Sequence, residues 1–142
     1  MEKRLEVDIQ VIVHATEDPQ KIFDAFKETF GVDKEDFAVQ SLKGHFENPI
    51  MLLRAKLKKK KAKSFVVALI SSIPKAEIDS IVGDLESRCD DSALFLRISK
   101  QSLVQNKVAL SDNDPVRLRI FSPIYSQRDV VKTYSEILNG TI

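Results

Sequence analysis

The sequence predicts a two-layer α+β fold, in which a curved, mixed or mostly antiparallel sheet packs helices against one face. Three observations predict this class. The length of 142 residues suits one domain, 1–142. Stretches that are apolar at every second residue alternate with stretches that are apolar at every third or fourth. Short links join most neighbouring strands, which favours antiparallel pairing.

The N-terminal part of the chain predicts a strand and then a capped helix. Residues 5–13 alternate apolar with polar side chains, the pattern of a strand with one buried face. Thr16 or Asp18 can cap the helix, and Pro19 suits its first turn. Gly31 is a good C-terminal stop because glycine readily adopts the left-handed conformation found there.

The rest of the chain continues the alternation of strands and helices. Predicted strands over 36–42 and 51–58 flank the turn-rich segment 44–49. A helix over 59–72 follows directly, and Pro74 separates it from the next helix. The remaining expected elements are a strand, a short helix or turn, a short strand, a turn, a strand and a closing helix, over 94–98, 100–106, 107–110, 111–115, 116–121 and 130–138.

Composition excludes several classes of protein. Apolar residues make up 43% of the chain and charged residues 30%, as in a folded, soluble protein. The single cysteine, Cys89, excludes a disulfide framework and a four-cysteine zinc site, and it fits the cytoplasm. The longest apolar run, 65–70, is far shorter than the about 20 residues that cross a bilayer. We therefore expect no membrane association.

Positive charge is concentrated in one stretch. The net charge is +1, but residues 48–76 contain no acidic residue, so the remainder has a net charge of −7. Such an asymmetry indicates a candidate anion-binding face. The eight basic residues of the stretch are Arg54, Lys56, Lys58, Lys59, Lys60, Lys61, Lys63 and Lys75.

Lys58–Lys61 fall where the predicted strand gives way to a helix, and Lys63 follows one turn later. Cations at a helix N-terminus are unfavourable by about 0.3–1 kcal/mol each at low salt. One interpretation is that the group binds a polyanion such as nucleic-acid phosphate. The other is a solvated surface run, neutralised by acidic residues that follow in the chain, namely Glu77, Asp79, Asp84, Glu86, Asp90 and Asp91.

Basic and aromatic residues also interleave on the face of the sheet that points away from the core. They are Arg54, Lys56, Phe95, Arg97, Arg117, Arg119 and Phe121. This mixture suits single-stranded RNA, since phosphates pair with basic side chains and bases stack on rings. The alternatives are cross-strand pairing with Glu6 and Asp8, or burial of the face in a dimer.

Enzyme motifs are nearly absent. His14 and His45 can form a metal site with Glu47 or Asp18 only if the fold brings them together, because their spacing is not helical. The four glycines begin no phosphate-binding loop, and Cys89 is expected to be a packing residue. We therefore predict no catalytic residue, metal or cofactor.

Four segments together resemble one family. They are His14-Ala15-Thr16-Glu17-Asp18, Gly44-His45-Phe46-Glu47-Asn48-Pro49-Ile50, Lys100-Gln101 and Asp114-Pro115-Val116-Arg117. In this order they resemble an archaeal group of small RNA-binding proteins described as predicted exosome subunits. The resemblance implies a fold like that of the fifth large-subunit ribosomal protein, RNA association, no known catalysis and frequent dimers.

The loop 44–49 is open to two interpretations. His45, Phe46 and Asn48 can present an aromatic ring and an amide to a base, or they can simply form a turn. The resemblance favours RNA contact by these three residues. Glu47 departs from it, since the family is expected to have a small residue there and a carboxylate beside phosphate is unfavourable.

The preferred hypothesis is a non-catalytic, cytoplasmic RNA-binding protein that contacts the backbone of single-stranded or structured RNA. The resemblance adds a role as an accessory of RNA processing or degradation, exosome or ribosome-associated partners, and a homodimer. The alternatives are an assembly subunit that docks on an acidic protein without touching RNA, and a hydrolytic enzyme built around His14 and His45.

Overall fold

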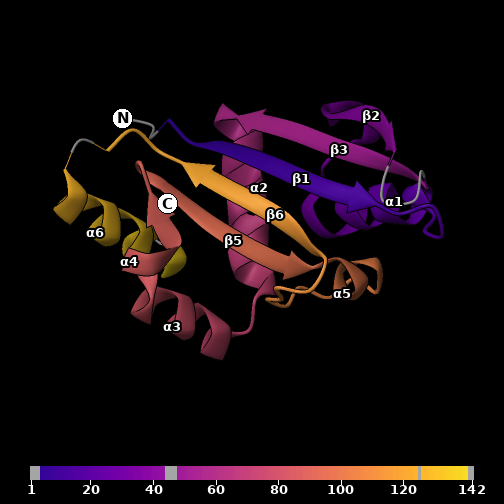
Figure 1. Cartoon of the computed structure of the whole chain (residues 1–142). Helices are drawn as coiled ribbons and strands as arrows, with labels where there is room; N and C mark the ends of the chain where they lie inside the picture. Colours follow the sequence, from indigo (N-terminus) through magenta and orange to yellow (C-terminus); the bar gives the residue numbers. More distant parts are fainter. Residues whose placement is uncertain (1–3, 44–47, 125, 141–142) are drawn as a thin grey trace.

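The computed structural model describes residues 4–43, 48–124 and 126–140, and over these the α+β class is confirmed (Figure 1). Six strands form one sheet in the order β2-β3-β1-β6-β5-β4, and each neighbouring pair is antiparallel. The elements are β1 (Glu6–Val13), α1 (Pro19–Phe30), η1 (Lys34–Asp36), β2 (Phe37–Lys43), β3 (Pro49–Lys58), α2 (Lys59–Ser72), α3 (Lys75–Gly83), α4 (Leu85–Arg88), β4 (Cys89–Asp90), β5 (Ala93–Ser99), α5 (Lys100–Val104), β6 (Pro115–Phe121) and α6 (Gln127–Leu138).

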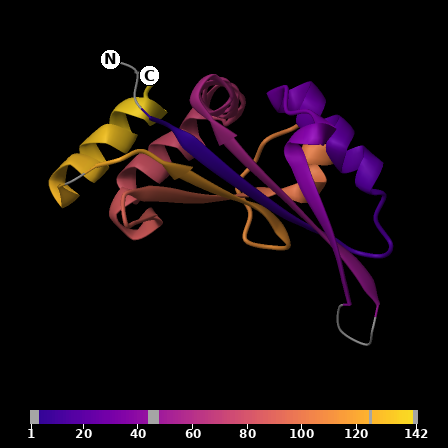
Figure 2. The same cartoon turned by 90° about the horizontal axis from the view of Figure 1, so that it is seen from above.

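The sheet has one covered and one open face. Figure 2 shows α1, α2 and α6 on the same side of the sheet. The burial of β1 shows the same two faces, because its residues alternate strictly between half-buried and buried from Glu6 to Val13. The odd-numbered residues of β1 point into the helical layer, and the even-numbered ones point to the open face.

Local signals place the ends of α1 as predicted. The Asp18 side chain accepts a hydrogen bond from the Gln20 backbone N–H at 3.0 Å, which caps the helix. Gly31 ends it with φ 69°, a left-handed conformation that glycine adopts without steric cost.

The prediction of a strand over 107–110 is wrong. Leu110 forms only an isolated bridge with Ile98, although the Ser99 N–H also donates to the Ala109 carbonyl at 2.8 Å. The chain then bends away at 112–114, so the pairing ends before a strand can form. The short strand β4, which was not predicted, pairs with the other end of β5.

Aromatic packing and one buried tyrosine fix the helical layer. Rings from α1, β2 and α2 pack together, and the centroids of Phe26 and Phe37 are 5.1 Å apart. Tyr134 on α6 is fully buried; its hydroxyl donates to the Ser92 carbonyl at 2.5 Å, lies 3.0 Å from the Ile120 carbonyl and accepts from the Ser122 N–H at 3.1 Å. Burial raises the pKa of this hydroxyl, which stays neutral and joins α6 to β6.

Across the described ranges, every helix is too short or too polar to span a membrane.

Candidate nucleic-acid interface

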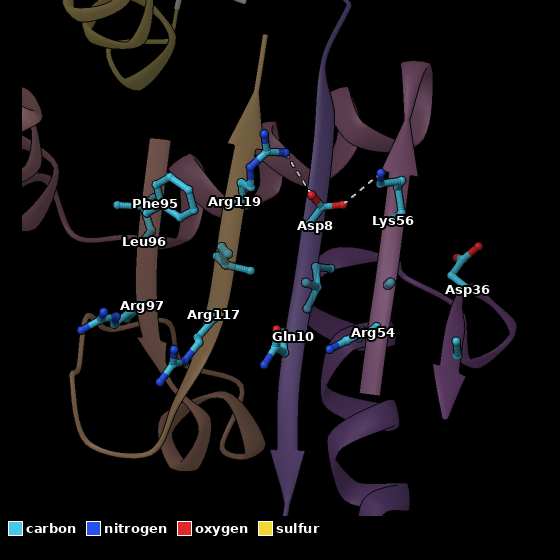
Figure 3. A pocket seen from close by; sticks show the side chains of 14 residues that line it. Asp8, Gln10, Asp36, Arg54, Lys56, Phe95, Leu96, Arg97, Arg117 and Arg119 are labelled. Carbon is cyan, nitrogen blue, oxygen red and sulfur yellow. Dashed lines mark hydrogen bonds and ion pairs between the residues drawn. The ribbon is translucent and has the colours of Figure 1, made fainter. Parts of the chain in front are cut away.

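Strand register arranges the open face in two rows that cross the sheet. Arg97 lies opposite Arg117, Arg117 opposite Gln10, and Gln10 opposite Arg54; we call these four residues the arginine row. Two residues further along each strand, on the same face, lies a second row, which we call the mixed row; it consists of Phe95, Arg119, Asp8 and Lys56. Figure 3 shows the two rows side by side across β5, β6, β1 and β3.

Both rows line a groove of about 820 Å³, which we call the open-face groove. Five cationic side chains and two carboxylates line it, so its net charge is positive. The lining residues are Asp8, Ile9, Gln10, Asp36, Ala38, Arg54, Ala55, Lys56, Phe95, Leu96, Arg97, Arg117, Leu118 and Arg119. The structure therefore brings together four of the predicted contact residues, Arg54, Lys56, Arg117 and Arg119.

The mixed row is partly neutralised within the protein. Asp8 accepts a hydrogen bond from Arg119 Nη1 at 3.1 Å, and its other oxygen lies 3.9 Å from Lys56 Nζ. The Arg119 guanidinium also lies over the Phe121 ring, 5.1 Å from its centroid. Cross-strand pairing with Asp8, one of the two sequence interpretations, is thus confirmed for these two cations.

The arginine row is not neutralised in this way. Within 4–43, 48–124 and 126–140, Arg54 and Arg117 are exposed and take part in no ion pair. Arg97 is 3.5 Å from Asp112, but the two side chains are 55% and 88% exposed, so water weakens this pair. Because Arg97 and Arg117 lie directly opposite each other, their like charges destabilise the sheet.

Phe95 presents an aromatic ring beside these arginines. Phe95 is 44% exposed, and it is the one aromatic residue among the large hydrophobic residues that are exposed in the described part of the chain. Phe95 also lines a second hollow of about 660 Å³, whose charged residues are Asp84, Arg88, Asp90, Arg97 and Asp112. Phe95 therefore lies at the boundary between the cationic open-face groove and a hollow whose positive and negative charges nearly balance.

The lysine cluster, Lys58–Lys61 and Lys63, lies where β3 passes directly into α2. Lys58 is the N-cap and makes no side-chain cap, while Lys59 has a left-handed φ of 54°. The side chain of Lys58 shares the open face with Arg54 and Lys56, since all three are exposed at alternate positions of β3. The cluster is thus continuous with the open-face groove along β3.

The second interpretation of the lysine cluster, its neutralisation by later acidic residues, is wrong. Among the described residues, none of those carboxylates pairs with a lysine of the cluster; Asp84 pairs with Arg88 instead. Lys61 does pair, at 2.7 Å, with Asp36 at the end of η1. The hydrogen bond from Lys61 lowers the pKa of Asp36, and the same bond raises the pKa of Lys61.

Asn48, a described residue of the segment 44–49, lies far from the lysine cluster. Asn48 is exposed and precedes β3, whereas Lys58 ends it, so the two lie about 30 Å apart at the rise of an extended strand. His45 and Phe46 lie outside the described residues. Contact between this loop and RNA therefore stays a prediction.

Sequence reasoning missed a buried cluster at the end of β1. The Lys100 side chain is only 1% exposed, and its Nζ donates to the Ile12 carbonyl at 2.7 Å and to Glu17 Oε1 at 2.8 Å. It also lies 2.8 Å from Asp114 Oδ2, and His14 Nε2 is 3.2 Å from the same oxygen. Three of the four segments that carry the family resemblance meet here, which was the signal available in the sequence.

This cluster does not suit a metal ion. His14, Glu17 and Asp114 offer ligand atoms within 4.8 Å of one another, but the Lys100 ammonium already occupies the position between the carboxylates. Burial raises the pKa of Asp114, but hydrogen bonds from Lys100 and His14 more than offset it, and the net shift is downward. We call this cluster the Lys100 clamp, because its ion pairs join the start of α5 to Glu17, which follows β1, and to Asp114, which precedes β6.

Cys89 is a half-buried residue at the end of α4, and burial raises the pKa of its thiol. A raised pKa disfavours the reactive thiolate, in line with the expected packing role.

Comparison with known proteins shows the family of the chain. The family model described as RNA binding matches residues 6–121. RNA-binding protein PAB1135 of Pyrococcus abyssi is 27% identical over 143 residues, which cover 94% of this chain and 93% of that protein. An uncharacterized protein of Methanocaldococcus jannaschii is 28% identical over 140 residues, 93% of each chain. The crystal structure of protein AF2318 from Archaeoglobus fulgidus, of the DUF54 family, superposes with a TM-score of 0.79 at 30% identity, covering 95% of this chain and 99% of that one. The chain therefore belongs to the RNA-binding family that this model describes.

Proposed function

We propose that this protein is a non-catalytic RNA-binding protein whose open-face groove and lysine cluster contact RNA phosphates. The observation that carries the proposal is the arginine row. Arg54 and Arg117 lack an ion pair within the described part of the chain, and Arg97 faces Arg117 across the β5–β6 pair. An arrangement that costs folding stability is explained if a polyanion supplies the missing negative charge.

Salt dependence of RNA binding tests the proposal. If about five phosphates are contacted, the logarithm of affinity falls with the logarithm of salt at a slope of about −3.5. Raising salt from 50 to 200 mM then weakens binding about 100-fold. Failure to retain RNA at 50 mM salt, or a flat salt dependence, would overturn the proposal.

A charge-matched pair of variants locates the surface. The double variant Arg54→Gln, Arg117→Gln should make the slope shallower by about 1.4, because two phosphate contacts are lost. The control Arg128→Gln, Lys132→Gln removes two exposed cations from α6, on the other side of the sheet, and should leave the slope unchanged (Figure 2). Equal effects of the two double variants would assign binding to overall charge and not to the open face.

Narrower parts of the proposal come from the sequence and the resemblance. We propose that the protein is cytoplasmic, that it forms a homodimer, and that it acts as an accessory of exosome-related RNA processing. Sedimentation tests the dimer, and co-purification with exosome or ribosome-associated proteins tests the last role. Incubation with RNA and Mg²⁺, Mn²⁺ or Zn²⁺ should leave the RNA intact.

The competing function is an assembly subunit that docks on an acidic protein. Such a subunit does not bind RNA, so excess RNA should leave the acidic partner bound unless the two surfaces overlap. Competition between RNA and an acidic partner therefore separates the two functions.

A further inference from the structure

We infer that the open-face groove takes single-stranded RNA, with one unpaired base stacked on Phe95 and the sugar-phosphate backbone along the arginine row toward the lysine cluster. The inference rests on the proposed function and adds the class of RNA and its orientation. Its basis is the position of one exposed ring at the boundary between the cationic open-face groove and a hollow that holds three carboxylates and two arginines.

The ring is free to stack. Phe95 is 44% exposed, and the aromatic pairs found within the described ranges do not include it. By contrast, the Phe121 ring on the neighbouring strand is covered by the Arg119 guanidinium. Of the two rings that the sheet presents at this edge, only Phe95 is therefore free to accept a base on its face.

Phosphate contacts lie within reach of a base on this ring. Arg97 is two residues from Phe95 on the same face of β5, about 7 Å along the strand. Arg117 lies directly opposite Arg97, and Arg119 lies opposite Phe95. Figure 3 shows the Phe95 ring at the end of the mixed row, with Arg97 and Arg117 at the same edge of the arginine row.

Charge sets the orientation of the strand. Beyond Phe95, three carboxylates and two arginines line the second hollow, so it attracts phosphates less than the open-face groove, where five cations face two carboxylates. On the other side, exposed cations continue along β3 from Arg54 through Lys56 to Lys58. The backbone is therefore placed toward β3, with the base directed toward β5.

A duplex cannot use this arrangement fully. Its bases are stacked on each other and paired, so a duplex meets the cations but leaves the Phe95 ring uncovered unless a base is extruded. Stacking of one base on an aromatic side chain changes affinity by about 5- to 150-fold. Single-stranded RNA should therefore bind more tightly than a duplex of the same sequence.

The experiment compares a 12-nucleotide unstructured RNA with the corresponding 12-base-pair duplex at one salt concentration. The variant Phe95→Leu should weaken single-strand binding about 5- to 150-fold and leave duplex binding and the salt slope unchanged. Phe95→Tyr keeps a ring and should retain binding. The matched control Val67→Ala truncates an exposed apolar residue of α2, 43% exposed, and should change neither affinity.

A second measurement needs no variant. A strand that carries 2-aminopurine should lose fluorescence on binding, since stacking on a ring quenches this base. Equal affinity for the single strand and the duplex, an unaffected Phe95→Leu variant, or unchanged 2-aminopurine fluorescence would each overturn this inference while leaving RNA binding intact. Absence of binding to either RNA would instead overturn the proposed function on which it rests.

Discussion

Replacing Lys100 with methionine removes a buried cation while keeping a side chain of similar length and volume. The ammonium donates to the Ile12 carbonyl and contacts the carboxylates of Glu17 and Asp114 at 2.8 Å each. Removing one partner of a fully buried ion pair costs about 3–5 kcal/mol. Here Glu17 and Asp114 are 26% and 43% exposed, so water compensates part of the loss.

We therefore expect Lys100→Met to lower the free energy of unfolding by about 2 kcal/mol. For a chain of 142 residues this corresponds to a fall in Tm of about 7 °C. Urea unfolding followed by circular dichroism measures the first quantity, and a thermal scan measures the second. Asp114→Asn should be costly in the native background but close to neutral beside Lys100→Met, because the carboxylate has then lost its cation.

The same clamp predicts an effect of pH. The pKa of Asp114 is lowered in the folded protein from the ordinary value of 3.8. A lowered carboxyl pKa adds stability above the unfolded pKa, and this stability is lost as the pH falls through the folded pKa. Native protein should therefore lose stability more steeply than Lys100→Met below about pH 4. A Lys100→Met protein as stable as the native one, or equal costs of Asp114→Asn in both backgrounds, would refute the clamp.

Two further substitutions test the helical layer and the lysine cluster. Tyr134→Phe leaves the buried Ser122 N–H without its acceptor and should lower the free energy of unfolding by about 1–3 kcal/mol in urea; unchanged stability would contradict this. The double variant Lys59→Gln, Lys60→Gln keeps the Lys61–Asp36 pair and relieves repulsion at the start of α2, so Tm should not fall. Its RNA affinity should weaken equally for all sequences in a binding titration, and a loss confined to one sequence would argue against phosphate contact.

Local patterns account for most of the predicted elements. The ends of α1 depend on Asp18 and Gly31, which act within one helical turn, so a short window contains the whole signal. The start of α2 at Lys59 was predictable because strand alternation stops there. The prediction of a strand over 107–110 was wrong because the apolar pattern of this segment is that of a strand, whereas its pairing depends on where the chain bends next.

The candidate site was predictable only as a set of residues. Alternation along β3 and β6 places Arg54 and Arg117 on the open face, but it does not say which strands are neighbours. That Arg97 faces Arg117, and that Asp8 lies between Arg119 and Lys56, follows from register between distant segments. Pairing over such separations leaves no trace in a local pattern.

The two groups of cations therefore differ in role. The lysines of the cluster are long, exposed side chains at the end of β3, where water and salt screen their repulsion. Arg97 and Arg117 are held opposite each other by the β5–β6 pairing, so the backbone keeps their like charges close together at the centre of the groove. Charges at a rim mainly raise the association rate, whereas groups that contact the ligand at the centre mainly slow dissociation. The loss of affinity in Lys59→Gln, Lys60→Gln should thus appear chiefly in the association rate, and that in Arg54→Gln, Arg117→Gln chiefly in the dissociation rate.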